Sequence, residues 1–170
     1  MRVAGVIRDS LVNGEGVRDV LFVQGCPHHC PKCQNPQTWE FDGGKDWLTT
    51  DLANIFKDSP NNITISGGEP FAQWASVVSF MYFVRVNNPD KRFWIYTGYN
   101  YDDIKRIVES YMISYVDVIV DGKYIEELNC PNCLYRGSSN QRLIDVKQTV
   151  GSGNIVLWAT KLLLRLIGVI

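Results

Sequence analysis

The chain has 170 residues, a length that suits a single domain able to bury a hydrophobic core. Hydrophobic residues make up 45% of it and charged residues 21%, a balance that excludes an intrinsically disordered protein. The net charge of -1 and the pI near 6.1 exclude a global positive field that would draw the chain onto nucleic acid or an anionic membrane. Small molecules or a protein are therefore the expected partners.

The predicted elements alternate between strand and helix. The strands expected are short, β-branched or aromatic segments, at residues 20–23, 63–66, 92–96 and 116–120, with a weaker one at 143–146. The helices expected between them cover residues 51–56, 74–86 and 102–111. This alternation predicts an α/β fold with a mainly parallel sheet and flanking helices, in which ligands bind at the carboxyl ends of the strands.

The location of the protein is suggested by its first residues and its cysteines. The first residues lack a basic stretch followed by an apolar run, so no signal peptide is predicted and the protein is expected in the cytoplasm. Of the five cysteines, three lie within eight positions. This distribution favours metal ligation in a reducing compartment over a secreted disulfide framework.

Three cysteines, Cys26, Cys30 and Cys33, follow the first predicted strand with CxxxCxxC spacing. One loop can wrap them around one corner of a [4Fe-4S] cluster. Electron-transfer clusters usually have four protein ligands, so three thiols leave one iron open for a bound molecule. Two alternatives stay open at this point: the thiols are merely buried or reduced, or His28 or His29 completes a tetrahedral zinc site with them.

A second motif, residues 63–70 (ITISGGEP), runs from the second predicted strand into two glycines, an acid and a proline. Gly67 and Gly68 would let the backbone approach a ligand closely, and Glu69 could pair with an ammonium group. By itself the segment also fits an ordinary tight turn. Both motifs follow predicted strands, however, and together they indicate one ligand site.

The two motifs resemble those of the radical S-adenosylmethionine (SAM) superfamily, in which three cysteines hold a [4Fe-4S] cluster and a GGEP-like segment binds the methionyl part of SAM. The resemblance implies an abbreviated partial (β/α) barrel in residues 1–150, and the sequence beyond it, residues 151–170, is predicted to be an apolar tail of unknown role. Further segments make the chain similar to the activating proteins of anaerobic (class III) ribonucleoside-triphosphate reductase. These segments are residues 11–18 (LVNGEGVR), 35–39 (NPQTW), 94–99 (WIYTGY), 118–123 (VIVDGK) and 135–142 (YRGSSNQR).

This resemblance covers most of the chain, residues 5–146, and implies a reaction. SAM would bind the open iron, and an electron from a flavodoxin-like donor would cleave it to methionine and a 5'-deoxyadenosyl radical, which generates a glycyl radical on the reductase. The protein itself orients the cofactors and excludes water. The family often has Tyr at the position of Gln34, so backbone contacts to the adenine are expected from this stretch. The cofactor-binding residues implied are Lys32, Cys33, Gln34, Gly67, Gly68 and Glu69.

Two rival interpretations remain. The first is an activase for a different glycyl radical enzyme, which binding to candidate partners would separate from the leading interpretation. The second, from another class, is an iron-sulfur electron carrier or a zinc-binding module, which binds metal without cleaving SAM. Neither the carrier nor the module needs a GGEP segment at a strand end.

Several other residues have two interpretations each. One set either shapes the mouth of the site and meets the partner, or forms a turn with a solvated arginine: Asn13, Gly14, Gly16 and Arg18. Lys123 either faces the cofactor or lies in a surface turn. Three aromatic residues either line the adenosine site or belong to the core, as strand aromatics usually do: Trp94, Tyr96 and Tyr99.

Two features lie outside the resemblance. Cys130 and Cys133 form a CxxC in an expected loop, for which the favoured interpretation is two reduced thiols or an occasional disulfide, with half a metal site or a redox pair as alternatives. Residues 155–170 follow a Gly-Ser-Gly linker at 151–153 and are mostly apolar, with Lys161 and Arg165 one helical turn apart. This pattern predicts an amphipathic helix that docks on its own domain or on a partner rather than on a membrane, unless the end of the chain is non-native.

Overall fold

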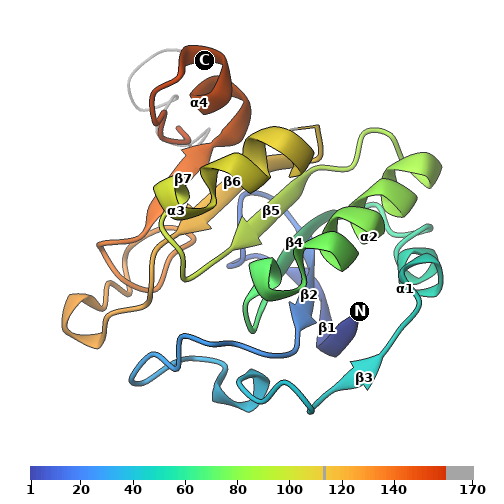
Figure 1. Ribbon diagram of the computed structural model, residues 1–170, viewed down its shortest axis with the longest axis horizontal. Coiled ribbons are helices and arrows are strands. Elements are labelled where there is room, and N and C mark those ends of the chain that lie inside the picture. Colours follow the sequence, from blue (N-terminus) through green and yellow to red (C-terminus); the bar gives the residue numbers. More distant parts are fainter. Residues whose placement is uncertain (113, 160–170) are drawn as a thin grey trace.

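The computed structural model describes residues 1–112 and 114–159 (Figure 1). Seven strands among these residues form one sheet with the order β3-β1-β2-β4-β5-β6-β7. The central strands β2, β4, β5 and β6 run parallel, and β1, β3 and β7 pair antiparallel toward the edges. The strands are β1 (Arg2–Ser10), β2 (Arg18–Val23), β3 (Lys45–Asp46), β4 (Asn62–Gly67), β5 (Phe93–Tyr96), β6 (Val116–Asp121) and β7 (Arg142–Asp145).

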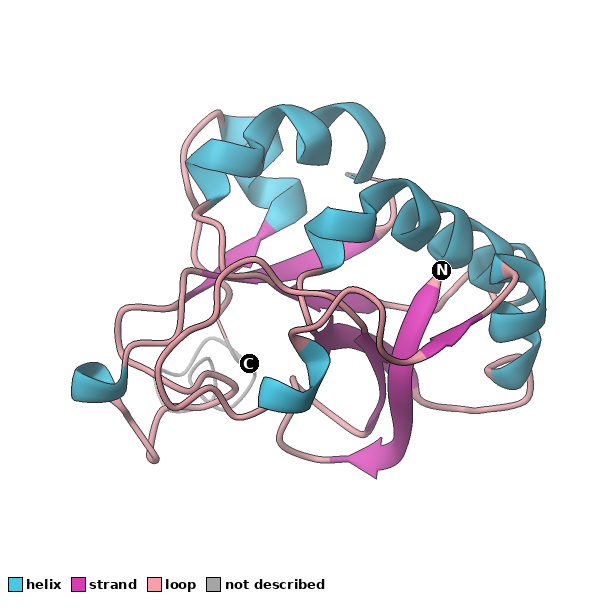
Figure 2. Ribbon diagram, turned by 60° about the horizontal axis from the view of Figure 1, so that its bottom comes forward, coloured by secondary structure: helices cyan, strands magenta, loops and turns pink. Residues whose placement is uncertain are grey.

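Helices α1, α2 and α3 gather over one face of this sheet, and Figure 2 shows mostly loops and short turns on the other. The α-helices are α1 (Thr49–Ile55), α2 (Trp74–Asn87), α3 (Tyr101–Ile107) and α4 (Val146–Ser152). Three 3-10 turns, η1 (Pro36–Thr38), η2 (Pro70–Gln73) and η4 (Glu126–Leu128), and a π-helical turn, η3 (Val108–Met112), complete the described elements. Within the described part of the chain, no helix has the length and apolar character needed to cross a membrane.

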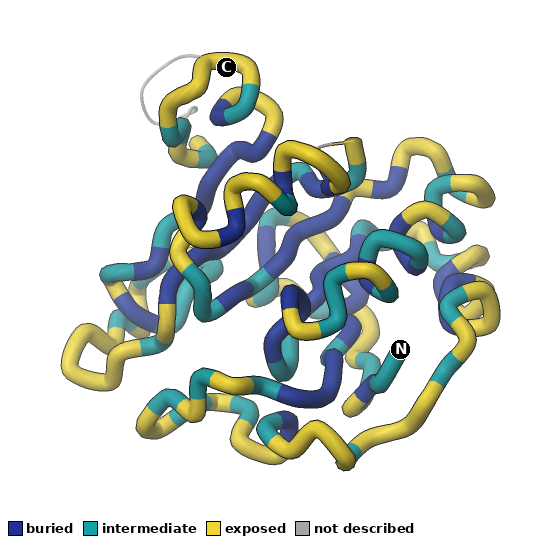
Figure 3. Tube along the Cα trace, in the orientation of Figure 1, coloured by how far each residue is buried: buried dark blue, intermediate teal, exposed yellow. Residues whose placement is uncertain are grey.

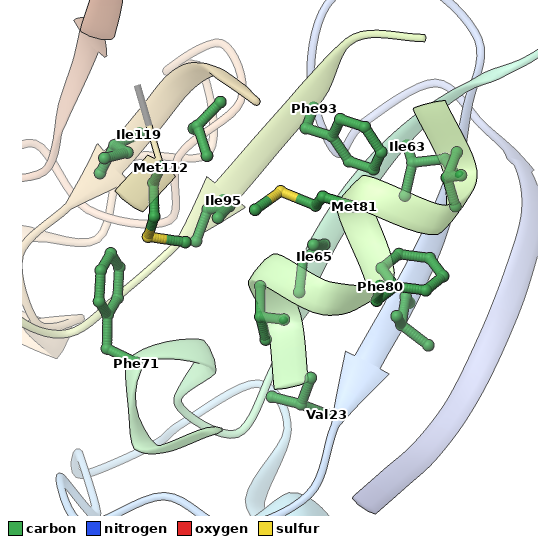
Figure 4. Close-up of a cluster of buried hydrophobic side chains, with 14 of the residues drawn as sticks. Val23, Ile63, Ile65, Phe71, Phe80, Met81, Phe93, Ile95, Met112 and Ile119 are labelled. Atoms are coloured by element: carbon green, nitrogen blue, oxygen red, sulfur yellow. The ribbon is translucent and has the colours of Figure 1, made fainter. Parts of the chain in front are cut away.

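The main hydrophobic core lies between the sheet and these helices. Figure 4 shows Phe80 and Met81 of α2 among Ile63, Ile65 and Ile95 of the central strands. Successive side chains of a strand point to opposite faces of the sheet. Residues of the central strands that point away from the helices form a second, smaller cluster on the other face. That cluster is built from Trp94, Val118, Val120 and Leu143. The central strands are accordingly buried along most of their length (Figure 3).

The expected α/β class with flanking helices is confirmed, and the sheet is mixed, with the expected parallel strands at its centre and antiparallel strands toward its edges. The five expected strands and three expected helices are all present, with ends that differ by a few residues. Strands β1 and β3 and helix α4 were not expected. The weak strand expected at 143–146 ends at Asp145, because the Asp145 carboxylate accepts a hydrogen bond from Gln148 N at 2.8 Å and caps α4.

The expectation for the last residues is wrong where the structure describes them. Gly151 and Ser152 end α4 rather than forming a linker, and Gly153 adopts the left-handed conformation at its C-cap (φ 70°). Residues 155–159 are not helical but run antiparallel beside β7, with Trp158 N donating to Leu143 O at 2.7 Å. The remainder of the expected helix, residues 160–170, lies outside the described residues.

Candidate functional site

A cleft lies at the carboxyl ends of the four parallel strands. The segments that follow β2, β4, β5 and β6 all contribute to its walls, as the topology of a parallel sheet predicts. The cleft brings together most of the residues that the two sequence motifs singled out: Cys26, Cys30, Cys33, Gln34, Gly67, Gly68 and Glu69. Lys32 is exposed and is not among the residues that line the cleft.

The segment that carries the cysteines is held at its start by backbone hydrogen bonds. Gly25 N donates to Thr38 O at 2.8 Å, and Cys26 N donates to Trp39 O at 2.9 Å. Gly25 has a φ of 91°, and a Cβ built on it would lie 2.5 Å from the ring of Phe41. A side chain at position 25 would therefore meet both backbone strain and a collision.

The cysteine loop turns sharply between Cys26 and Cys33. His29 (φ 45°) and Lys32 (φ 57°) adopt left-handed backbone conformations, which reverse the chain direction within a few residues. Cys33 N closes one turn onto Cys30 O at 3.1 Å. All three cysteines of the loop are free and half-buried, and all three line the cleft.

Burial affects the protonation of the loop thiols. It raises the pKa of the Cys26 thiol, against the effect of the His28 and His29 backbone N–H groups. It also raises the pKa of the Cys30 thiol, as does its neighbour Cys33, and the nearby charge of Lys123 acts in the opposite direction. Because metal binding needs thiolates, a cation in the cleft would stabilise charges that burial disfavours.

The donor set fits a cluster better than a single metal ion. Within residues 1–112 and 114–159, no three His, Cys, Asp or Glu side chains are grouped so that they could hold one ion. The ligands of a [4Fe-4S] cluster bind different irons and need not converge on one point. His28, considered above as a zinc ligand, directs Nε2 to Glu69 at 2.9 Å.

Gly67 and Gly68 join the end of β4 to the cysteine loop. Gly67 has a φ of 98°, and a Cβ built there would lie 2.7 Å from Val23 O. At Gly68 the Cβ would lie 2.3 Å from Gly25 O. The N–H groups of Gly68 and Glu69 donate to Val23 O and Gly25 O, each at 2.8 Å. The two glycines thus let the end of β4 lie close to the backbone at Val23 and Gly25. The sequence pattern had instead predicted a close approach to a ligand.

Glu69 connects three segments of the site. Its side chain is 1% exposed, and its two oxygens accept four hydrogen bonds. Phe71 N (3.0 Å) and Thr97 Oγ1 (2.8 Å) donate to Oε1, and Gly98 N (2.8 Å) and His28 (2.9 Å) contact Oε2. The carboxylate therefore binds protein donors from the cysteine loop, from its own segment and from the end of β5.

The sequence pattern did not single out Thr97 and Gly98 as site residues, and it indicated His28 only as a candidate zinc ligand. Thr97 and Gly98 directly follow a parallel strand and line the cleft. The rule that singled out the residues after β2 and β4 could therefore have found them. Nothing in the sequence pattern pairs His28 with an acid 41 residues away.

The three aromatic candidates occupy different places. Trp94 belongs to the second core cluster, where it packs edge-on against Tyr135. Tyr96 lines the cleft and donates from its hydroxyl to Tyr135 O at 2.6 Å, and burial raises the pKa of this phenol. Tyr99 packs edge-on against His28, with ring centroids 4.6 Å apart. Lys123 is exposed, as the surface-turn interpretation expects.

Arg18 is buried, so the interpretation as a solvated turn residue is wrong. It is 1% exposed, and it donates to Ile63 O and Thr64 Oγ1, both at 2.6 Å. Burial lowers the pKa of its guanidinium to about 10. Thr64 Oγ1 in turn donates to Asn13 O at 2.6 Å. Arg18 and Thr64 thereby hold the loop that places Asn13 at the wall of the cleft.

A second cavity adjoins the cleft. The two share Asn13, Gln34, Tyr96 and Gly137 as lining residues. Cys130 and Cys133 line the second cavity and are joined by a disulfide, which is one of the states in the favoured interpretation of this pair.

Comparisons with known proteins agree on one family. A family model described as a 4Fe-4S single cluster domain matches residues 12–144. Three similar proteins bear the name anaerobic ribonucleoside-triphosphate reductase-activating protein. The one from Haemophilus influenzae is 37% identical over 139 residues, which are 77% of this chain and 89% of that protein. The one from Escherichia coli K12 is 34% identical (77% and 90%), and the one from phage T4 is 39% identical (78% and 86%).

Proposed function

The chain belongs to the family of anaerobic ribonucleoside-triphosphate reductase-activating proteins, and we propose that it activates such a reductase by reductive cleavage of SAM at a [4Fe-4S] cluster. The product of this reaction is a glycyl radical on the reductase. The protein is thus an activating enzyme of the radical SAM class, and one cluster per chain, with three cysteine ligands and one iron open for SAM, is its resident cofactor.

One observation carries this proposal: the cysteine loop and the GGEP segment form a single cleft. Gly68 and Glu69 donate backbone hydrogen bonds to the chain just before Cys26, and the three free thiols line the same cavity as Gly67, Gly68 and Glu69. An electron carrier or a zinc module needs no second motif beside its ligands. The 4Fe-4S family match likewise favours a cluster over zinc.

The chain's residues have separate tasks in this reaction. Cys26, Cys30 and Cys33 would hold the cluster. Gly67, Gly68 and Glu69 would lie beside the amino end of SAM, with the Glu69 carboxylate holding this segment through its protein donors. Lys32 and Gln34, on either side of Cys33, lie in the stretch that would meet the adenosine. When bound, the cluster supplies the electron that cleaves the sulfonium bond of SAM.

The wider setting belongs to the same proposal. Four parallel strands with helices between them support an abbreviated radical SAM partial barrel in residues 1–150. The protein acts in the cytoplasm, its partner is the glycyl radical subunit of the reductase, and a flavodoxin-like protein is its electron donor.

The experiment that tests the proposal is anaerobic. The protein is reconstituted with iron and sulfide, reduced with dithionite and mixed with SAM, and iron and 5'-deoxyadenosine are quantified. We expect roughly four irons per chain and deoxyadenosine formation that disappears in Cys30→Ala. Tight zinc binding, or a cluster that never cleaves SAM even beside the reductase, would refute it. Binding to other glycyl radical enzymes but not to the reductase would favour a different activase.

A further inference from the structure

The side chain of His28 is largely buried although the residue lies in a loop between two candidate cluster ligands. Its side chain is 8% exposed, whereas the adjacent His29 is an exposed residue. The ring packs edge-on against Tyr99, and a Cβ built on Gly98 would lie 2.3 Å from its Cδ2 atom. Position 98 therefore has room for the imidazole of His28 only because it is glycine.

The ring contacts the carboxylate of Glu69, whose other hydrogen bonds all come from the protein and join separate segments. His28 Nε2 lies 2.9 Å from Glu69 Oε2. The other groups that contact the two Glu69 oxygens are N–H or O–H donors, so these oxygens act as acceptors and the ring donates from Nε2. The other donors to Glu69 come from its own segment, at Phe71, and from the end of β5, at Thr97 and Gly98.

The contact fixes a stretch of the loop that the backbone bonds do not reach. The N–H groups of Gly68 and Glu69 bind carbonyls of Val23 and Gly25, both of which precede Cys26. His28 instead lies between Cys26 and Cys30. Its hydrogen bond therefore sets the position of the loop between the first two thiols relative to the end of β4.

We propose that His28 is a positioning residue: by its hydrogen bond to Glu69 it fixes the cysteine loop against the GGEP segment and so sets where SAM lies relative to the cluster. The inference rests on the proposed function. A hydrogen bond to a buried charged group is among the stronger ones in proteins, and displacement of a reacting centre by about 1 Å can slow a reaction by about 100-fold. A small shift of this loop would therefore affect SAM more than the fold.

The test compares three variants of the full-length reconstituted protein. His28→Ala removes the ring, His28→Gln offers an amide N–H near the position of Nε2, and His29→Ala is the matched control in the same loop. Iron content, the Kd for SAM, the EPR spectrum of the reduced cluster with and without SAM, and kcat and KM for SAM cleavage are measured for each.

We expect His28→Ala to retain its iron but to bind SAM about tenfold or more weakly, in line with the loss of one charge-assisted hydrogen bond. The change that SAM causes in its EPR spectrum should be reduced as well. His28→Gln should recover SAM binding to within about threefold of wild type. His29→Ala loses an edge-on ring contact with Trp39 but no contact with the GGEP segment, so its Kd for SAM should also stay within about threefold of wild type. If His28→Ala loses its iron, the Kd for SAM of His28→Gln compared with that of His29→Ala tests the role of His28 instead.

The proposal is overturned if His28→Ala and His29→Ala share the same Kd and spectra, or if His28→Gln is no better than His28→Ala. These outcomes are distinct from a failure of the proposed function. A wild-type protein that binds SAM without cleaving it would refute that function, and the binding and EPR comparisons would still decide on His28.

Discussion

Gly68 is the position where the two motifs of the site approach most closely, and no side chain fits there. A Cβ would lie 2.3 Å from the carbonyl oxygen of Gly25 and 2.8 Å from its carbon, and backbone atoms cannot move aside as the tip of a flexible side chain can. Gly68 does not have a positive φ, so an alanine at this position would meet a steric collision but no backbone strain. We expect Gly68→Ala to force β4 away from the cysteine loop at a cost of about 1–3 kcal/mol in the free energy of unfolding.

Urea unfolding of the apoprotein, followed by circular dichroism, measures this cost. With a slope of about 1–3 kcal/mol per molar urea, the midpoint should fall by about 1 M while the slope stays unchanged. Gly5→Ala in β1 is the matched control, because a Cβ there has no atom within 4 Å. Its midpoint should equal or slightly exceed that of wild type. Equal midpoints for both variants would refute the close approach of the two motifs.

Three further predictions concern features outside the cleft. Arg18→Lys should lower the free energy of unfolding by about 1–3 kcal/mol, because an ammonium cannot replace the buried guanidinium fork. An unchanged free energy of unfolding in this variant would contradict the burial of Arg18. Burial tends to raise the pKa of Asp19, but hydrogen bonds from Asn61, Ser59, Arg8 and the Asp9 backbone outweigh this and hold the pKa below 3.8. Stability from this group is fully present above 3.8, the ordinary pKa, and is lost as the pH falls below it through the lower pKa of the folded protein. The urea midpoint of Asp19→Asn should therefore fall less than that of wild type between pH 7 and about pH 3. Alkylation of the denatured, unreduced protein should modify the three loop cysteines and spare Cys130 and Cys133, and labelling of Cys130 before reduction would contradict the disulfide.

The central strands could be predicted because each contains a short run rich in β-branched or aromatic residues, whereas the edge elements carry weaker signals. In β1, only Val3 is buried and Ile7 is 53% exposed, so the strand lacks the alternation that marks a half-buried strand. Helix α4 contains β-branched residues and Gly151 and has little intrinsic preference for a helix. Residues 155–159 illustrate the ambiguity of short apolar runs, which suit either a helix or an extended segment until a pairing edge such as β7 is present.

Site residues could be predicted where they belong to a motif of fixed spacing, and could not be predicted where their roles depend on contacts between residues far apart in the sequence. Cysteine spacing placed the three thiols together, and the strand-end rule placed Gly67 and Gly68 beside them. The partners of Glu69 come from three segments, and no local pattern joins them. Arg18 was misread because an arginine after two glycines suggests a turn, whereas here it begins β2 and reaches under Trp94.

The central claim is that the protein creates a glycyl radical on its partner, and EPR spectroscopy tests it most directly. The reconstituted protein is mixed anaerobically with SAM, a reductant and the anaerobic ribonucleotide reductase. The account predicts a glycyl radical signal on the reductase that requires SAM and is absent with Cys30→Ala. A protein that holds its cluster and cleaves SAM, yet leaves the reductase without a radical, would contradict the account.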